Sequence, residues 1–465
     1  MPSFAPDILE AWTGGRWSGR PPAALSGFSV DSRRIASGQA FVALKTDKRD
    51  GHDFVGAARA GGAAAAVVAR AESGAELPQL VVADPLAALQ TIAREHRRRF
   101  KGTVIGITGS AGKTSTKDLL CVLLGGEGAG VLATEANLNN QIGVALTLCR
   151  LDLDRHRHAV VEAGISAPGE MEILARMIEP DLALVTLVAP AHLADLGGVE
   201  EVAREKAILA RHLRADGLCF FPSSCERYEA FLRLPADRSL ILENAAGAVV
   251  GRNRIRYSAA HAGAFTTVEV AFGPPPPVVA TLSRVTEGMA QNTALAMCAA
   301  LQTGAHREEI RRRLLTWRPA PLRGEWRVSE GRRLYLDCYN ANPASMADAL
   351  AAFAALAPAD EPRLFVIGCM EELGAEAPSY HAELGRSLLL RPADRLVAIG
   401  SLAGSIRRGA LEAGVSPAQV EIADSIDPLA ARVAAFRGSV FVKGSRRHGL
   451  ERAFAPGEMA EASHA

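Results

Sequence analysis

Residues 104–115 carry the pattern with the most specific chemistry in this chain. An apolar run, Val-Ile-Gly-Ile, leads into a glycine-rich turn that ends in Gly-Lys-Thr, and a helix-like segment follows at 117–124. Backbone N–H groups of small residues can surround a polyphosphate, and Lys113 adds a positive charge. The Thr114 hydroxyl is a ligand type for Mg²⁺, and the helix N-terminus adds its positive dipole end. We predict a phosphate-binding loop, in which Ile107 replaces the first glycine of the strict Walker pattern.

Four more polar residues stand at or just after the ends of predicted strands. They are Glu162, His192, Asp337 and Lys443. In a doubly wound sheet, ligands bind at the carboxyl ends of the strands. A single acid in such a place is equally well explained as a solvated cap. Several polar groups around one phosphate loop favour ligands for Mg²⁺ and a nucleotide.

Lys206 interrupts an apolar helical stripe. The segment after Gly197-Gly198 places apolar residues at helical spacing, with the lysine in the middle: 199, 202, 206, 209 and 213. One interpretation is a snorkelling lysine whose ammonium reaches water. The other is a desolvated, neutral amine that reacts with CO₂, so that the resulting carbamate binds a metal together with His192.

The segment 337–346 reads Asp-Cys-Tyr-Asn-Ala-Asn-Pro-Ala-Ser-Met. Asn342 is predicted to cap a helix that begins at Pro343. This structural role does not account for Tyr339 and Asn340, which directly follow a strand-end aspartate. Free N–H groups in the first turn of the helix could bind a carboxylate.

The alternation of apolar strands and helices predicts an α/β protein of three domains, with boundaries at 1–101, 102–319 and 320–465. The first domain has short apolar runs at 39–44, 63–68 and 80–82 and ends in a basic helix. A proline-broken linker at 317–322 precedes the last domain. Buried parallel strands are predicted at 104–107, 159–162 and 182–188, and further strands at 334–336, 364–367, 396–399 and 440–442.

Composition narrows the functional class. The chain has 465 residues and a net charge of +1, which gives no general attraction to nucleic acid or anionic membranes. No apolar run reaches membrane-spanning length, and the N-terminus lacks the pattern of a signal peptide. The seven cysteines are scattered without a Cys-x-x-Cys pair, which favours reduced thiols over disulfides or zinc. We expect a cytoplasmic monomer that neither binds nucleic acid nor inserts into a membrane.

Taken together, these motifs resemble those of the Mur ligases, the ATP-dependent amide-forming enzymes of peptidoglycan synthesis. The resemblance extends over nearly the whole chain. Its most specific sign is Tyr-Asn-Ala-Asn-Pro at 339–343 followed by Glu-Leu-Gly at 372–374. That pair is typical of the member that joins D-alanyl-D-alanine (D-Ala-D-Ala) to a UDP-N-acetylmuramoyl tripeptide. Further matching segments are 31–33, 38–44, 50–54, 108–114, 134, 137–143, 162, 169–170, 189–193, 206, 381 and 443–446.

The resemblance implies a role for each matching residue. It implies a small UDP-binding first domain, a central ATP-binding domain and a Rossmann-like C-terminal domain. ATP would be bound by Gly109, Ser110, Ala111, Gly112, Lys113, Thr114 and Ser115, with Asn292 at the adenine, Asp337 at the ribose and Arg323 at the γ-phosphate. Substrates would contact Ser32, Arg33, Thr134, Asn139, Asn140, Tyr339 and Asn340, with Ser32 and Arg33 at the UDP. Thr114 and Glu162 would bind one Mg²⁺, and His192 and carbamylated Lys206 a second. The catalytic residues would be Lys113, His192, Lys206 and Arg323.

The implied reaction proceeds through an acyl phosphate that the incoming amine attacks, and Arg323 would complete the site when the third domain closes. The chain departs from the family pattern at Ala145, Ser166, Ala167, Leu187, Gly288, Cys338 and Cys369. These departures bear on rate and on the finer nucleotide contacts. All the implied metal and phosphate ligands remain, so we expect an active enzyme.

Three alternatives stay open. One is the ligase that adds the third amino acid, although its Asp-Asn-Pro-Arg signature is absent here. A folylpolyglutamate synthase is another, although such enzymes lack the Asp-Ser-Arg domain. The third is a P-loop NTPase that acts as a regulator. The sequence also leaves open whether residue three of the acceptor peptide is diaminopimelate or lysine.

Overall fold

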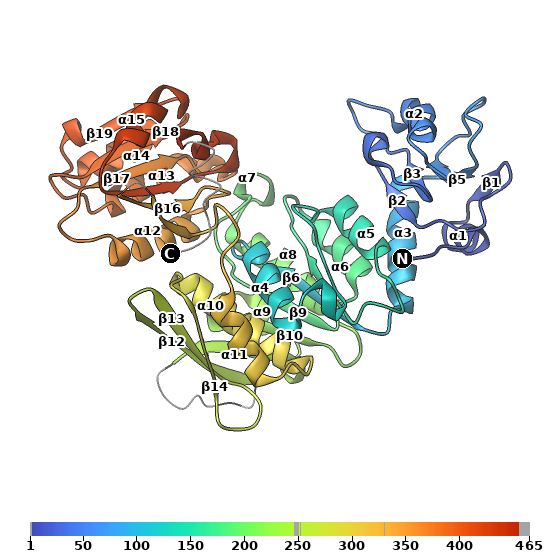
Figure 1. Cartoon of the computed structure of the whole chain (residues 1–465), viewed down its shortest axis with the longest axis horizontal. Coiled ribbons are helices and arrows are strands. Elements are labelled where there is room, and N and C mark those ends of the chain that lie inside the picture. The colour runs from blue at the N-terminus through green and yellow to red at the C-terminus, as the bar shows by residue number, and fades with distance from the viewer. Residues whose placement is uncertain (1, 246–250, 252, 330, 455–465) are drawn as a thin grey trace.

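The computed structural model describes residues 2–245, 251, 253–329 and 331–454, and these form three sheets (Figure 1). The first sheet has the strand order β1-β5-β4-β3-β2. β1 is antiparallel to β5, and the other neighbours are parallel. The three short apolar runs predicted in the first domain are β3, β4 and β5. The strands are β1 (Arg16–Ser18), β2 (Gly27–Ser29), β3 (Gln39–Val42), β4 (Ala65–Val68) and β5 (Gln79–Val81).

One helix joins the first domain to the central one. The first domain contains α1 (Pro6–Thr13), α2 (Val55–Ala60) and α3 (Pro85–Arg99). α3 packs on α5 (Gln141–Cys149) and α6 (Glu170–Ile178), and one apolar cluster contains residues of both domains. The guanidinium of Arg97, buried in this contact, donates to the carbonyl oxygens of Ile178 and Glu179 and to the carboxylate of Asp181. The first and central domains therefore share a core.

The central sheet has the order β14-β13-β12-β11-β10-β9-β6-β8-β7. It is parallel from β7 to β12 and antiparallel from β12 to β14, and the sequence did not predict this antiparallel extension. β6 lies between β8 and β9, so the loop after β6 lies beside the ends of both. The strands are β6 (Thr103–Thr108), β7 (Val131–Ala133), β8 (His158–Glu162), β9 (Leu182–Val185), β10 (Leu218–Pro222), β11 (Ser239–Asn244), β12 (Arg254–Ala262), β13 (Phe265–Ala271) and β14 (Val278–Ser283).

Helices cover both faces of the central sheet, which explains the near-continuous apolar strands. Val104 and its neighbour Ile105 belong to different apolar clusters, one on each face of the sheet. One face packs on α5, α6 and α8, and the other on α4 and α10. The remaining central helices are α4 (Lys113–Leu124), α7 (Leu193–Leu196), α8 (Val199–Arg211), α9 (Glu229–Leu232), α10 (Glu287–Gln302) and α11 (Arg307–Thr316).

The third sheet has the order β15-β16-β20-β17-β18-β19 and is parallel except for β15. Asp337 and Lys443 are register partners at the carboxyl ends of β16 and β20. The predicted strands are therefore present, and two of the predicted strand-end residues are neighbours. The elements are β15 (Glu325–Ser329), β16 (Arg332–Asp337), α12 (Pro343–Leu356), β17 (Arg363–Gly368), α13 (Ala377–Ser387), β18 (Arg395–Ile399), α14 (Ala403–Glu412), β19 (Val420–Ala423), α15 (Ala430–Ala435) and β20 (Ser439–Lys443).

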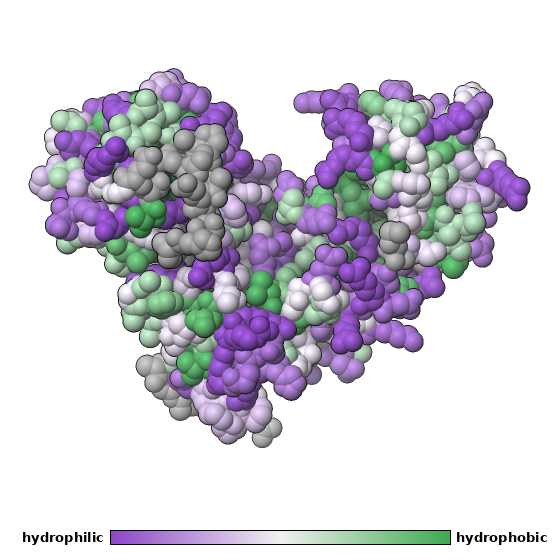
Figure 2. Space-filling model, viewed as in Figure 1, coloured by the Kyte–Doolittle hydropathy of each residue, from purple (hydrophilic) through white to green (hydrophobic). Residues whose placement is uncertain are grey.

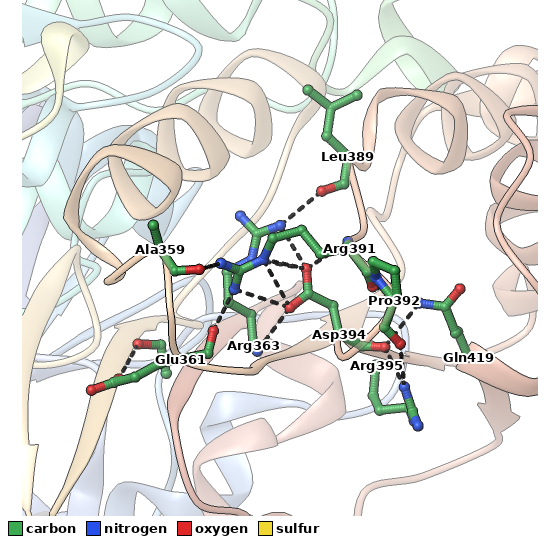
Figure 3. Close-up of polar contacts among 10 residues, drawn as sticks. Ala359, Glu361, Arg363, Leu389, Arg391, Pro392, Asp394, Arg395 and Gln419 are labelled. Atoms are coloured by element: carbon green, nitrogen blue, oxygen red, sulfur yellow. Dashed lines mark hydrogen bonds and ion pairs between the residues drawn. The ribbon is translucent and has the colours of Figure 1, made fainter.

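A buried carboxylate lies at the other end of this third sheet, at the amino ends of its strands (Figure 3). Asp394 is 0% exposed and accepts hydrogen bonds from the backbone N–H groups and the guanidinium groups of Arg363 and Arg391. The Gln419 amide donates to the carbonyl oxygens of Arg391 and Asp394. Because Arg363 begins β17 and Asp394 precedes β18, this cluster fixes the amino ends of two strands and has a structural role.

The first and third sheets lie on either side of the central one, and Figure 2 shows the surface hollowed between them. Within the described ranges, every helix is too short or too polar to cross a membrane. All seven cysteines are free thiols, as predicted.

Candidate active site

A cavity of about 430 Å³ lies where the phosphate loop faces the third domain. The loop, the start of α10, the 317–324 linker and the ends of β16 and β20 line it. Of the predicted site residues, it brings together Ser110, Ala111, Gly112, Lys113, Thr114, Ser115, Asn139, Glu162, Asn292, Arg323, Asp337, Tyr339 and Asn340. Residues more than 200 positions apart in sequence thus meet at one site.

Two glycines let the phosphate loop pack closely against its neighbours. A Cβ on Gly109 would lie 1.9 Å from the Thr186 hydroxyl, and one on Gly112 would lie 2.3 Å from the Asn292 amide nitrogen. Both have a positive φ, which favours glycine. The Thr186 hydroxyl donates to the carbonyl oxygen of Ala111, and β9 ends one residue earlier, at Val185, rather than at the predicted residue 188. Gly109 belongs to the loop but is not among the residues that line the cavity.

The loop concentrates positive charge. Lys113 donates to the carbonyl oxygen of Gly109 over 2.8 Å. Burial lowers the pKa of Lys113; the Glu162 carboxylate opposes this shift and the Arg323 guanidinium adds to it. Two cations that destabilise one another in a cavity favour a polyanion between them.

Thr114 and Glu162 converge as the sequence predicted. The Thr114 hydroxyl donates to one carboxylate oxygen of Glu162 over 2.9 Å, and the Asn139 amide donates to the other over 2.8 Å. The backbone N–H of Glu162 donates to the Thr134 hydroxyl. A carboxylate and a hydroxyl side by side are ligands suited to Mg²⁺. Asn139 and Thr134 therefore hold Glu162 in place. Asn140 instead uses its side-chain oxygen to cap α5.

Lys206 does not snorkel. Its side chain is 2% exposed, whereas a snorkelling ammonium would reach water. Burial, with Lys113 adding to it, lowers the pKa of Lys206 well below its usual value, so the neutral amine is favoured. Burial also lowers the pKa of His192, and Lys113 and Lys206 both act on it, so these three residues share one electrostatic neighbourhood. Of the two interpretations, the structure favours the desolvated amine.

His192 is the N-cap residue of α7 and has a positive φ, and its Nδ1 lies 2.5 Å from a carboxylate oxygen of Glu372 in the third domain. Among the described residues, no group of three His, Cys, Asp or Glu side chains could hold a metal ion. A metal here would therefore need ligands outside that set, such as a hydroxyl, a modified lysine or phosphate oxygens.

The third domain contributes a second charged pair. Lys443 donates to the Asp337 carboxylate over 2.5 Å and to the carbonyl oxygen of Asn340 over 3.2 Å. The Arg323 guanidinium lies over the Tyr339 ring, 3.8 Å from its centroid. This contact orients Arg323 within the cavity.

Three further contacts join the central and third domains, and the sequence predicted none of them. The Asn342 amide donates to the carbonyl oxygen of Ser110 over 3.0 Å. The backbone N–H of Ala194 donates to the carbonyl oxygen of Glu372. The N–H of Gly288 donates to the Asp348 carboxylate over 3.1 Å. In the sequence, Asp348 could have been singled out as the one acidic residue of an alanine-rich helix.

The predicted cap at Asn342 is confirmed, and a capping box forms with Ser345. This cap limits the anion site expected at the same helix end. Pro343 has no N–H group, and the N–H of Ser345 is bonded to Asn342. Among the first three helical residues of α12, that leaves the N–H of Ala344 for a ligand.

Ser32 and Arg33 lie outside the cavity. They form a short 3₁₀ turn after β2, and the Arg33 side chain is 85% exposed and paired with Asp31. Two of the departures from the family pattern, Cys338 and Cys369, are buried thiols. Burial raises their pKa values to about 12 and about 11, so these thiols are neutral, unreactive groups.

Family models match three parts of the chain. The "Mur ligase family, catalytic domain" model matches residues 25–97, "Mur ligase middle domain" 107–299, and "Mur ligase, glutamate ligase domain" 322–446. The UDP-N-acetylmuramoyl-tripeptide–D-alanyl-D-alanine ligase of Escherichia coli is 31% identical over 385 residues, which cover 82% of this chain and 83% of the relative. The enzyme of the same name from Mycobacterium tuberculosis is 31% identical over 477 residues, which cover 90% and 89%.

Solved structures give the same comparison. MurF from Acinetobacter baumannii superimposes with a TM-score of 0.83 at 28% identity, covering 97% of this chain and 98% of the other. MurF from Thermotoga maritima in complex with ADP superimposes with a TM-score of 0.77 at 25% identity, covering 92% of this chain and 96% of the other. A folylpolyglutamate synthase from M. tuberculosis superimposes with a TM-score of 0.59 at 15% identity, covering 82% of this chain and 95% of the other. At that identity, the likeness is one of fold alone.

Proposed function

The chain belongs to the Mur ligase family, and we propose that it joins D-Ala-D-Ala to a UDP-N-acetylmuramoyl tripeptide with conversion of ATP to ADP and phosphate. The observation that carries this function is the shared cavity. The phosphate loop and Lys113 line one side of it, and Asp337, Tyr339 and Asn340 from another sheet line the other. Such an arrangement suits a reaction between a nucleotide and a second substrate.

The chemistry divides into two transfers. The carboxylate of the tripeptide attacks the γ-phosphorus of ATP, ADP leaves, and an acyl phosphate forms. The amine of D-Ala-D-Ala then attacks the acyl carbon, loses a proton and displaces phosphate. Loop N–H groups, Lys113 and Arg323 stabilise the negative charge on the transferring group.

Two Mg²⁺ sites form part of the proposal. Thr114 and Glu162 would hold one ion, a role supported by their 2.9 Å contact. His192 and Lys206 would hold the other once the neutral amine has reacted with CO₂ and released a proton to give a carbamate. Bound there, the ions would neutralise phosphate charge. The burial of Lys206 supports the modification because it favours the neutral, reactive amine.

The remaining roles rest on position. We propose that Asn292, which packs on Gly112, contacts adenine, and that Asp337, oriented by Lys443, binds the ribose. Tyr339 and Asn340 would lie near the incoming dipeptide. Ser32 and Arg33, in the short 3₁₀ turn of the first domain, would hold the UDP of the acceptor. We also propose a cytoplasmic location, in keeping with the free cysteines, and a monomeric state.

The direct test is a substrate panel. Purified protein is incubated with ATP, Mg²⁺ and one acceptor, which is the diaminopimelate form of the UDP-muramoyl tripeptide, its lysine form, or the UDP-muramoyl dipeptide. D-Ala-D-Ala, diaminopimelate, lysine or glutamate is added as donor. Phosphate release and product mass are measured, with Lys113→Ala as the inactive control.

We expect an amide product with D-Ala-D-Ala alone among these donors. Ligation of diaminopimelate to a UDP-muramoyl dipeptide, without reaction of D-Ala-D-Ala, would move the protein to the preceding step. ATP hydrolysis that needs neither acceptor nor donor would instead favour a P-loop regulator.

A further inference from the structure

We infer that Asp348 is a positioning residue for nucleotide binding, because its carboxylate fastens α12 of the third domain to the N-terminus of α10 in the central domain. This inference rests on the proposed function in one respect, namely that the cavity is the nucleotide site. It goes beyond that function because it assigns a residue that holds the two walls of the cavity together.

The contact joins the two walls directly. Asp348 lies six residues after Asn342 on α12 and lines the cavity. Its Oδ1 accepts the N–H of Gly288 over 3.1 Å. Gly288 belongs to the first turn of α10, a 16-residue helix whose N-cap is Thr286. A carboxylate at a helix N-terminus satisfies an otherwise unbonded N–H group and interacts favourably with the helix dipole.

Gly288 makes this approach possible. A Cβ at that position would lie 2.6 Å from Oδ2 of Asp348 and 3.2 Å from its Cγ. Any larger side chain would therefore push the carboxylate away from the helix end. Gly288 is also a position at which the chain departs from the family pattern, where a histidine is expected. The glycine and the aspartate thus act as a pair.

The pair bears on the nucleotide through α10. Asn292 lies four residues after Gly288 on the same helix, and its amide packs on Gly112 of the phosphate loop. Across the cavity, α12 begins beside Tyr339 and Asn340. Fixing the N-terminus of α10 to α12 therefore sets the distance between the two groups of nucleotide contacts. Loss of the carboxylate should widen the site and weaken nucleotide binding.

Burial raises the pKa of Asp348, and hydrogen bonds from the Thr286 hydroxyl and the Gly288 N–H oppose that shift. The contact thus includes a hydroxyl and a backbone N–H from the same helix end. A neutral Asn at position 348 would keep one acceptor oxygen but would lose the charge. It should therefore retain part of the effect.

The experiment compares Asp348→Ala, Gly288→Ala and the double variant with wild type. Mg²⁺-ADP binding is measured by calorimetry, and kcat and the KM for ATP are measured in the ligase assay. We expect Asp348→Ala to raise the Kd for ADP and the KM for ATP about tenfold, as suits a hydrogen bond to a charged group, with kcat changed less than twofold. Gly288→Ala should have a similar effect.

The double variant gives the sharper result. Because a methyl at position 288 acts by displacing the carboxylate, it should cost nothing further once position 348 is alanine. Additive effects, or an unchanged ADP affinity in Asp348→Ala, would overturn the inference. Asp360→Ala, which removes an exposed acid of the same domain, is the matched control.

Folding and function can be separated from this result. Melting temperatures without nucleotide report on folding, and Asp348→Asn provides a second variant if the alanine form is unstable. Wild-type protein that binds ADP but makes no amide product would contradict the proposed function and leave the Asp348 measurement valid. Wild-type protein that does not bind ADP would overturn both.

Discussion

Asn342 offers the cleanest separation of folding from nucleotide binding, because its side chain has two independent contacts. Its oxygen accepts the N–H of Ser345 over 2.8 Å and caps α12. Its amide nitrogen donates to the carbonyl oxygen of Ser110 in the phosphate loop over 3.0 Å. Asn342→Asp keeps an equally good cap but replaces the donor with an oxygen that faces a carbonyl. Asn342→Ala removes both contacts.

The magnitudes follow from these contacts. Loss of the cap should cost about 1 kcal/mol of stability. Loss of the bond to Ser110 should cost about 1 kcal/mol in holding the third domain at the loop, or roughly fivefold in nucleotide affinity. Asn342→Asp adds a negative charge beside the polyphosphate in a nearly buried position. Its affinity for ADP should therefore fall by about ten- to a hundredfold, although its free energy of unfolding stays near that of wild type.

Urea unfolding and calorimetry with Mg²⁺-ADP measure the two effects. Ser345→Ala is the matched control, because it breaks the other half of the capping box and leaves the contact with Ser110 in place. We expect that control to lose stability but not affinity. Wild-type ADP affinity in Asn342→Asp would refute the reasoning, as would a loss of stability equal to that of Asn342→Ala.

Three further predictions concern the site and the fold. Lys206→Ala should lose nearly all ligase activity, and short carboxylic acids should partly restore it by supplying the missing metal ligand; normal activity would exclude the carbamate. Arg323→Ala should lower kcat about 10²- to 10³-fold, since it removes charge stabilisation in the transition state, and a change confined to the KM for ATP would refute that role. Burial acts to raise the pKa of Asp394, but hydrogen bonds from Arg363 and Arg391 hold it below its usual value. The stabilisation is therefore complete above the unfolded pKa of about 4 and is lost as the pH falls through the lower folded pKa. Asp394→Asn should cost about 3 kcal/mol at pH 7 in urea unfolding, a difference that shrinks in acid; a pH-independent difference would contradict this account.

Local patterns predicted the parts of the site that a single strand and its loop create. The apolar run before Gly109 predicted β6, and the strand-end position of Glu162 predicted that it lies near the phosphate loop, where it contacts Thr114. Asp337 and Lys443 were each predicted at a strand end, but their pairing depends on β16 and β20 being neighbours. Strand order is not encoded in local hydrophobicity, so that pairing could not be derived from spacing.

Patterns were less informative where one residue has two uses. Asn342 was predicted as a cap and is one, but the other end of its amide reaches Ser110. Asn140 was assigned to the substrate from family resemblance, and its oxygen also caps α5. In both cases the sequence shows the residue type, and the partner depends on how distant segments pack.

The packing of the domains suggests why the new contacts are polar. The first and central domains share an apolar cluster across α3, and separating them would expose that apolar surface to water at a cost in free energy. The third sheet has its own two clusters, and the third domain meets the central one through Tyr380, which packs on the shared cluster, and through hydrogen bonds of Asn342, Asp348 and Glu372. Hydrogen bonds of this kind contribute about 1 kcal/mol each, so a few of them hold a domain reversibly. A ligase must close over ATP for phosphoryl transfer and open to release ADP and product. In the proposed mechanism, a docking surface made largely of hydrogen bonds meets both needs, because a nucleotide polyanion bound between Lys113 and Arg323 would supply the remaining attraction in each cycle.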